Sequence, residues 1–135
     1  DLMPNDFVFQ ALRVGNLIVY QKDVRRTFVH VTDMARAFIH AIENYDRMKN
    51  EIYNVGDESM NATKEDVANL VKKYVKFYLH FAEIGTDPDM RDYEVSYQKM
   101  RSTGYQTQVS LDEGIQEIVS ALKLVKQENP YSNVM

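Results

Sequence analysis

Two stretches of sequence decide the fold class: RRTFVHVTDMARAFIHAIEN, from Arg25 to Asn44, and NEIYNVGD, from Asn50 to Asp57. In the first stretch, β-branched and aromatic residues predict a short strand over Thr27–Val31. Apolar residues then recur at helical spacing, at Met34, Phe38, Ala41 and Ile42. We expect Thr32 or Asp33 to cap this helix, because short polar side chains accept hydrogen bonds from the first free N–H groups.

Working outward, three further apolar runs are typical of strands. Ile52–Val55 is a short buried run that ends at Gly56, and Leu17–Tyr20 is similar to it. Val75–Ile84 is rich in aromatic and branched residues and predicts a third strand. Polar loops are expected over Gln21–Arg25 and over residues 85–92.

Helices are predicted between these strands by capping signals and periodicity. Pro4 suits a first helical turn, and the stripe that follows it ends before a C-capping Gly15. This stripe consists of Phe7, Val8, Ala11, Leu12 and Val14. A second helix begins at the Thr63–Asp66 capping box, and its apolar face consists of Val67, Leu70, Val71 and Tyr74.

The C-terminal third of the chain predicts two more helices. A short one is expected over Tyr97–Ser102, ending near Gly104. A longer one begins at the Ser110–Glu113 capping box. Its stripe is the clearest in the chain and consists of Leu111, Ile115, Ile118, Val119, Leu122 and Val125. Strands that alternate with helices predict one α/β domain, more specifically an α+β lobe, over residues 1–126, with a loose polar tail over 127–135.

Composition excludes several classes of protein. The 135 residues are 44% hydrophobic and 27% charged, as in an ordinary globular domain. The net charge of −4 argues against nonspecific binding to nucleic acid. No cysteine is present, which excludes disulfides and thiolate metal sites. No apolar run approaches the length of a membrane span, so we expect no membrane partner and a cytoplasmic location.

Four elements in this order resemble the C-terminal half of the extended short-chain dehydrogenase/reductases, the family of NAD-dependent sugar-nucleotide epimerases and dehydratases. They are LMP (Leu2–Pro4) followed by LIVY (Leu17–Tyr20), RTFVHVTDMARA (Arg26–Ala37), NEIYNVGD, and RDYEVSYQKMRSTGYQTQVSLDEGI (Arg91–Ile115). Any one of them is weak, whereas four in the family's order and spacing are specific. NEIYNVGD resembles the strand that rejoins the cofactor-binding half of these enzymes.

The resemblance implies a substrate-binding lobe separated from a Rossmann-type, dinucleotide-binding N-terminal half. In that half, a Gly-rich turn binds NAD or NADP at a helix N-terminus. Here the five glycines are scattered, at positions 15, 56, 85, 104 and 114. The family's catalytic Tyr-x-x-x-Lys pair is also expected upstream. We therefore expect this chain to bind no cofactor and to catalyse nothing by itself, with an NAD(P)-dependent epimerase or dehydratase as its parent.

The resemblance also implies the ligand, a nucleoside-diphosphate sugar whose pyrophosphate is held by two arginines during transient oxidation of the sugar. Arg26 matches one of these arginines and Arg91 is the best match to the other, while Arg25 stays open as the alternative to Arg26. A guanidinium suits phosphate because it is always charged and presents paired donors. Val19 and Tyr20 match the strand against which the family places the nucleobase.

Other motifs have simpler interpretations. Tyr45-x-x-x-Lys49 has the spacing of the catalytic pair, but it follows the signature helix where the family has a surface turn, so we consider it a decoy. The three histidines lack metal-ligand spacing, and His30 is expected to be a packed strand residue. Arg36 is expected to be solvated or paired with Asp33 or Glu43.

Three hypotheses therefore stand beside one another. The first is the substrate lobe of an epimerase or dehydratase, whose partners are the missing half and, in the parent, a second identical subunit. The second is a stand-alone, non-catalytic nucleotide-sugar-binding module. The third is an interaction remnant without a ligand. A separated lobe also predicts an exposed apolar face where the other half would dock.

Overall fold

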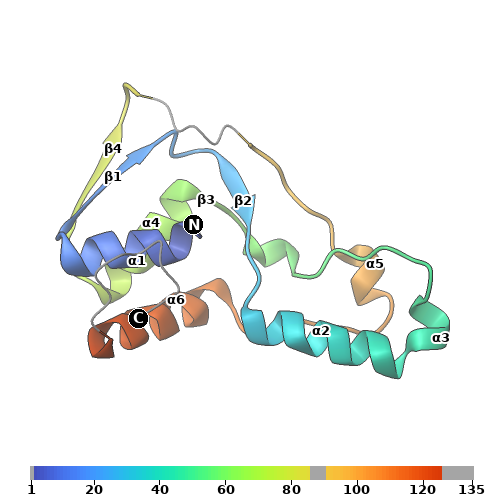
Figure 1. Ribbon diagram of the computed structural model, residues 1–135. Coiled ribbons are helices and arrows are strands. Elements are labelled where there is room, and N and C mark those ends of the chain that lie inside the picture. Colours follow the sequence, from blue (N-terminus) through green and yellow to red (C-terminus); the bar gives the residue numbers. More distant parts are fainter. Residues whose placement is uncertain (1, 86–90, 126–135) are drawn as a thin grey trace.

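The computed structural model describes residues 2–85 and 91–125 (Figure 1). The expected tail over 127–135 and most of the expected loop over 85–92 lie outside the described residues. The helices are α1 (Met3–Arg13), α2 (Val31–Glu43), α3 (Tyr45–Met48), α4 (Lys64–Tyr74), α5 (Gln98–Arg101) and α6 (Leu111–Leu124), with a 3-10 turn η1 (Glu58–Met60). The strands are β1 (Asn16–Tyr20), β2 (Arg25–Thr27), β3 (Asn61–Thr63) and β4 (Tyr78–Ala82).

Two small sheets organise the described residues into a mixed α/β fold, as expected. Strand β1 pairs in parallel with β4, so that Leu17 lies opposite Leu79, and β2 pairs antiparallel with β3, so that Arg26 lies opposite Ala62. A parallel pair needs a crossover connection, and here the chain between β1 and β4 supplies it with α2, α3 and α4.

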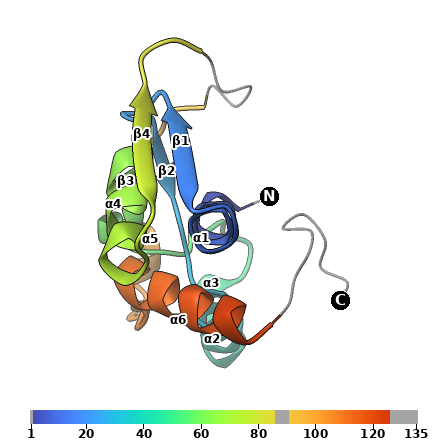
Figure 2. The ribbon, with the colours of Figure 1, turned by 90° about the vertical axis from the view of Figure 1, so that its left-hand side faces the viewer.

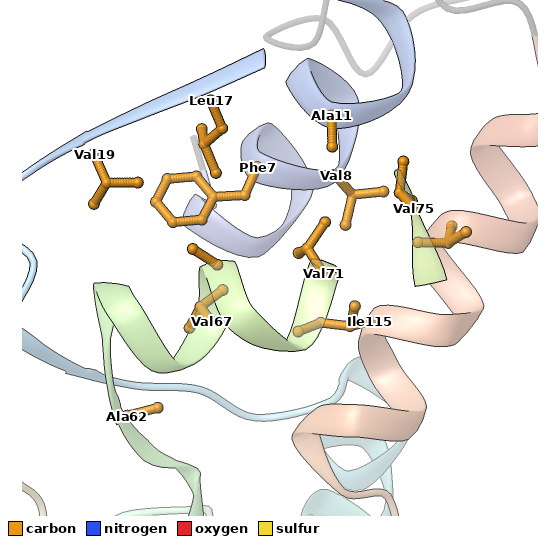
Figure 3. Packing of buried hydrophobic residues seen from close by; sticks show 12 residues of the cluster. Phe7, Val8, Ala11, Leu17, Val19, Ala62, Val67, Val71, Val75 and Ile115 are labelled. Atoms are coloured by element: carbon orange, nitrogen blue, oxygen red, sulfur yellow. The ribbon is translucent and has the colours of Figure 1, made fainter. Parts of the chain in front are cut away.

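The molecule has a body and an arm (Figures 1 and 2). In the body, α1, α4 and α6 pack against one another beneath the β1–β4 sheet. Their apolar stripes meet in the main core (Figure 3). Its buried members are Phe7, Val8, Ala11, Leu17, Val19, Ala62, Val67, Ala68, Val71, Val75, Ile115 and Val119. The body therefore contains most of the buried apolar surface that stabilises the fold.

The arm consists of α2, α3 and α5, which extend away from the body (Figure 1). Its core is smaller and has four buried members, Ala37, Met48, Met100 and Tyr105. Helix α2 is helical where expected, but Phe38 and Ile42 of its predicted stripe are 67% and 75% exposed. The side of α2 that faces the protein instead buries Asp33 and Ala37. This apolar exposure agrees with the exposed face predicted for a separated lobe.

The predicted strand over Thr27–Val31 is wrong by several residues. Strand β2 begins at Arg25, within the predicted loop. Its partner β3 pairs only with Arg25–Thr27, so the strand ends at Thr27. The chain then stays extended until α2 begins at Val31. His30, rather than Thr32 or Asp33, is the N-cap: its Nδ1 accepts a hydrogen bond from the Thr32 N–H at 3.3 Å. His30 is therefore a capping residue and not a strand residue.

The predicted strand over Ile52–Val55 is also absent from the described residues. This segment pairs with no strand there, and Ile52 is 86% exposed. A strand exists only where a neighbouring strand supplies hydrogen-bond partners, so a suitable composition is not sufficient.

The helix caps agree with the sequence. Both capping boxes form in full, with Thr63 and Ser110 as the N-caps of α4 and α6. Pro4 lies in the first turn of α1, and Gly15 follows the helix with a φ of +77°, which turns the chain into β1. The helix ends at Arg13, so Val14 lies outside it and is 59% exposed, contrary to its place in the predicted stripe. Strand β4 and helix α5 occupy the expected segments with narrower bounds.

Candidate functional site

Strand β2 lies where the body meets the arm (Figure 1), and it contains both Arg25 and Arg26. Successive side chains of a strand point to opposite faces. Arg25 is exposed, whereas Arg26 is only 9% exposed. Arginines are rarely buried, because the guanidinium loses hydration that other contacts must replace. Burial therefore distinguishes Arg26 from an ordinary surface arginine.

Two contacts orient the Arg26 guanidinium. Its Nη1 donates to the backbone carbonyl of Arg25 at 2.8 Å. Its Cζ lies 5.7 Å from the centroid of the Tyr93 ring, within the range of a cation–π interaction. The Arg25 carbonyl and the Tyr93 ring thus both restrict the position of the guanidinium.

Arg25 is bound by acids of a neighbouring segment. Its guanidinium forms an ion pair with Glu94, and its backbone N–H donates to Asp92 Oδ1 at 2.8 Å. Arg25 had stayed open as the ligand-facing alternative to Arg26. Burial therefore keeps Arg26, rather than the exposed Arg25, as the candidate for binding an anion.

Residues 91–97, which we call the strap, run beside the β2–β3 pair. The Asn61 side chain imitates a strand backbone, because its amide nitrogen donates to the Val95 carbonyl at 3.0 Å and its oxygen accepts from the Val95 N–H at 3.2 Å. At the end of the strap, the Tyr97 N–H donates to Glu58 at 3.0 Å, and the Tyr97 hydroxyl forms a short hydrogen bond with Thr27. Burial raises the pKa of Tyr97, so the phenol remains neutral at physiological pH.

Gly56 is required beneath the end of the strap. A Cβ added there would lie 2.6 Å from the Tyr97 ring, and the φ of +155° disfavours other residues. The predicted role of this glycine was to end a strand; its observed role is to let an aromatic ring pack on the backbone.

The strap begins at Arg91, the second candidate arginine. Arg91 is exposed and directly precedes Asp92, which binds the backbone of β2. Sequence reasoning chose Arg91 by resemblance, but it missed the residues that hold the strap in place. No pattern in the sequence indicated the roles of Asn61, Tyr93 and Glu94, because their partners lie 34 to 69 positions away in the chain.

Val19 and Tyr20 lie on β1 and present different groups. Val19 is 2% exposed and its side chain belongs to the core, so only its backbone could face a ligand. Tyr20 is 39% exposed, and one face of its ring packs on Gly85, where an added Cβ would lie 2.5 Å from the ring. The Tyr20 carbonyl accepts from Lys64 Nζ at 3.1 Å, and Lys64 is itself buried. Lys64 was not singled out from the sequence.

Asp33 has a structural role that differs from the predicted cap. Its buried carboxylate accepts from the backbone N–H groups of Gln108 and Val109, at 3.0 and 2.9 Å, and from Arg36 Nη1 at 3.0 Å. Burial alone would raise the pKa of Asp33, but these donors outweigh it and the pKa is lowered. The prediction that Arg36 pairs with Asp33 is confirmed. Asp33 therefore joins α2 to the segment before α6.

The remaining motifs do not assemble into a reactive site. Tyr45 and Lys49 lie at the tip of the arm, where Lys49 Nζ binds Asp46 at 2.9 Å (Figure 1). His30 Nε2 lies 2.9 Å from Glu117. Among residues 2–85 and 91–125, no cluster of three or more acidic or histidine side chains could hold a metal ion. The same residues include no helix long and apolar enough to cross a membrane.

Comparison with known proteins agrees with this geometry. Residues 5–56, which include most of α1 and all of β1, β2 and α2, match the NAD dependent epimerase/dehydratase family. Solved structures match over most of the chain. The UDP-glucose 4-epimerase of Thermus thermophilus, solved with NAD, is 20% identical, with a TM-score of 0.71, over 90% of this chain and 40% of its own.

Two further structures show the breadth of the likeness. A GDP-mannoheptose C4 reductase of Campylobacter jejuni, solved with NADP, is 26% identical, with a TM-score of 0.65, over 82% of this chain and 33% of its own. A monomeric L-threonine 3-dehydrogenase from a metagenome is 15% identical, with a TM-score of 0.75, over 93% of this chain and 42% of its own. This chain thus spans about two fifths or less of their lengths. Its fold is that of the C-terminal part of the Rossmann-type extended short-chain dehydrogenase/reductases, and its residues 5–56 are similar to the NAD dependent epimerase/dehydratase family.

Proposed function

We propose that this chain is the nucleotide-sugar-binding part of an NAD(P)-dependent epimerase or dehydratase, in which Arg26 and Arg91 bind the pyrophosphate of a nucleoside-diphosphate sugar. The observation that supports this most is the burial of Arg26 beside the strap that begins at Arg91. The epimerase and the reductase named above act on nucleotide sugars by their descriptions, which supports the substrate class.

The chemistry of the two arginines fits this role. Two guanidinium groups would supply positive charge and directed N–H donors for two adjacent phosphates. Anchoring the substrate at its pyrophosphate holds the sugar in place without engaging the carbon that reacts. The backbone of Val19 and the open face of Tyr20 would then lie against the nucleobase.

The described residues do not fit NAD or NADP. A dinucleotide turn needs glycines between a strand and a helix N-terminus whose N–H groups can meet phosphate. At the one direct strand-to-helix junction in the described part of the chain, from β3 into α4, the capping box of Thr63 and Asp66 occupies those groups. We therefore assign the cofactor, which would carry the hydride, to a part of the enzyme outside this chain.

The exposed apolar side of α2 is where we expect that other part to dock. Phe38, Ile39 and Ile42 are all more than half exposed there, and Ile52 follows on an extended segment. A cofactor-binding half that covers α2 and pairs with Glu51–Val55 would bury these residues and supply the missing strand partner.

Nucleotide titration tests the proposal. UDP and GDP are titrated calorimetrically into the chain and into Arg26→Ala, Arg91→Ala, Arg25→Ala and Arg47→Ala. Losing one charged hydrogen-bonding partner is expected to weaken binding by about 10- to 100-fold at Arg26 and Arg91. Arg47, on α3 at the tip of the arm, is the matched control and should change nothing. Undetectable binding of both nucleotides, or equal affinity in all variants, would refute the pyrophosphate site.

The alternative of a stand-alone binding module differs in what precedes it in the gene. A continuous reading frame upstream of the Asp1 codon, encoding a Gly-rich turn and a Tyr-x-x-x-Lys pair, would favour the enzyme. A stop codon followed by a start codon would favour the module, and the titration would then describe its whole function.

A further inference from the structure

The strap is fastened to the β2–β3 pair on both sides of Tyr93. Before Tyr93, the Asp92 carboxylate accepts from the Arg25 N–H at 2.8 Å. After it, Glu94 pairs with the Arg25 guanidinium, and Val95 forms its two hydrogen bonds with Asn61. Since both neighbours are fixed, the backbone of Tyr93 has little freedom, and its ring is delivered to one place.

That place is beside the Arg26 guanidinium, whose Cζ lies over the ring. The ring centroid lies 5.7 Å from Cζ, while the carbonyl of Arg25 binds Nη1 at the edge. The two acids that flank Tyr93 bind Arg25, and the aromatic ring between them lies against Arg26. The negative face of an aromatic ring attracts a guanidinium and so restricts where it lies.

The ring of Tyr93 is not needed for core packing. It is 39% exposed and belongs to neither buried cluster. A large aromatic residue that stays half in solvent while stacking on a buried cation suits a residue that shapes a binding surface.

We propose that Tyr93 is a positioning residue of the pyrophosphate site: its ring lies against the Arg26 guanidinium and restricts the orientations that this group can adopt. This inference rests on the proposed function of the two arginines. A guanidinium that is already oriented loses less rotamer freedom when it binds phosphate, so the ring strengthens binding without touching the ligand.

The test compares Tyr93→Ala with Tyr93→Phe. Phenylalanine keeps the ring and should bind UDP or GDP as the unchanged chain does, whereas alanine should weaken binding by about two- to fivefold. In an Arg26→Ala background the alanine change should have no further effect, because its partner is gone. A residue that merely supported the fold would weaken binding in both backgrounds, and that outcome would overturn the inference. Equal affinity of Tyr93→Ala and the unchanged chain would also overturn it.

A second measurement needs no ligand and separates this inference from the proposed function. In the NMR spectrum, the Arg26 Nε–H resonance should move when Tyr93 becomes alanine and stay in place when it becomes phenylalanine, because the ring current disappears only in the first. No movement in Tyr93→Ala would refute the stacking itself. Movement without any nucleotide binding by the unchanged chain would instead refute the pyrophosphate site and, with it, the positioning role.

Discussion

Replacing Asp33 with alanine should destabilise the protein strongly, although Asp33 lies outside the candidate site. The side chain is fully buried, and its carboxylate is the shared acceptor for the N–H groups of Gln108 and Val109 and for the Arg36 guanidinium. Its backbone carbonyl also accepts from the Tyr105 hydroxyl, a bond that the substitution leaves in place.

The size of the effect follows from what each donor loses. A buried donor left without an acceptor costs about 1–3 kcal/mol, and breaking a buried ion pair costs about 3–5 kcal/mol. Gln108 is exposed and the Arg36 side chain is 40% exposed, so water can replace part of what these two groups lose. The N–H of Val109 is the least replaceable. We therefore expect the Asp33→Ala variant to lose about 3 kcal/mol of unfolding free energy, or roughly 10 °C in Tm.

Urea denaturation followed by circular dichroism measures this loss. Arg36→Ala is the matched control, because it removes one partner but leaves the carboxylate its two backbone donors, and it should cost less than about 1 kcal/mol. Asp33→Asn, which keeps the shape, should fall between the two variants. If Asp33→Ala lies within about 1 kcal/mol of the unchanged chain, the carboxylate does not hold α2 to the segment before α6 and the reasoning fails.

Three further outcomes are expected. Gly56→Ala should destabilise the protein by about 1–3 kcal/mol, because the added Cβ would meet the Tyr97 ring. Gly114→Ala, inside α6, should stabilise the protein by up to about 1 kcal/mol, because the nearest atom to its added Cβ lies at 3.6 Å. Thermal melts that rank the two variants in the opposite order would contradict the packing. Thr63→Ala should cost about 1 kcal/mol by removing the cap of α4, and Thr63→Ser should restore most of it in the same assay. Because the pKa of Asp33 is lowered in the folded state, the carboxylate stabilises the fold fully above its ordinary pKa, and this stabilisation is lost as the pH falls below that value. The Asp33→Asn variant should therefore show a shallower acid denaturation curve than the unchanged chain. Parallel curves would count against this role of Asp33.

Local signals predicted the parts of the fold that local forces determine. The capping boxes at Thr63 and Ser110 form as expected, because a cap and its partner are three residues apart and need nothing else. The strand over Ile52–Val55 failed for the opposite reason, since pairing depends on a distant segment. Asp33 was misassigned because a carboxylate in a first helical turn satisfies the pattern of a cap, and only the tertiary structure shows that its acceptor oxygens point elsewhere.

The candidate site was only partly predictable. Resemblance selected Arg26 and Arg91, and burial then distinguished Arg26 from Arg25, which the sequence could not do. Tyr93 and Asn61 act through contacts with residues of other segments. No periodicity or motif marks such pairs in a single sequence, so the strap could not be anticipated.

The uneven distribution of buried surface links stability to binding. The arm has four buried core residues against twelve in the body, so it should open at a lower free energy than the body. The strap leads directly into α5 of the arm, and its Tyr97 is tied to the Glu58 side chain. When the arm opens, α5 no longer holds the end of the strap, so Tyr93 is positioned over Arg26 only by the bonds of the strap to Arg25 and Asn61 and is held less tightly. Apparent affinity for a ligand scales with the fraction of molecules in the competent state. A substitution such as Asp33→Ala, which loosens the arm at α2, should therefore weaken the proposed pyrophosphate binding only once the open arm is appreciably populated. The loss of affinity should then grow with temperature, whereas the loss caused by Arg26→Ala should be seen at every temperature.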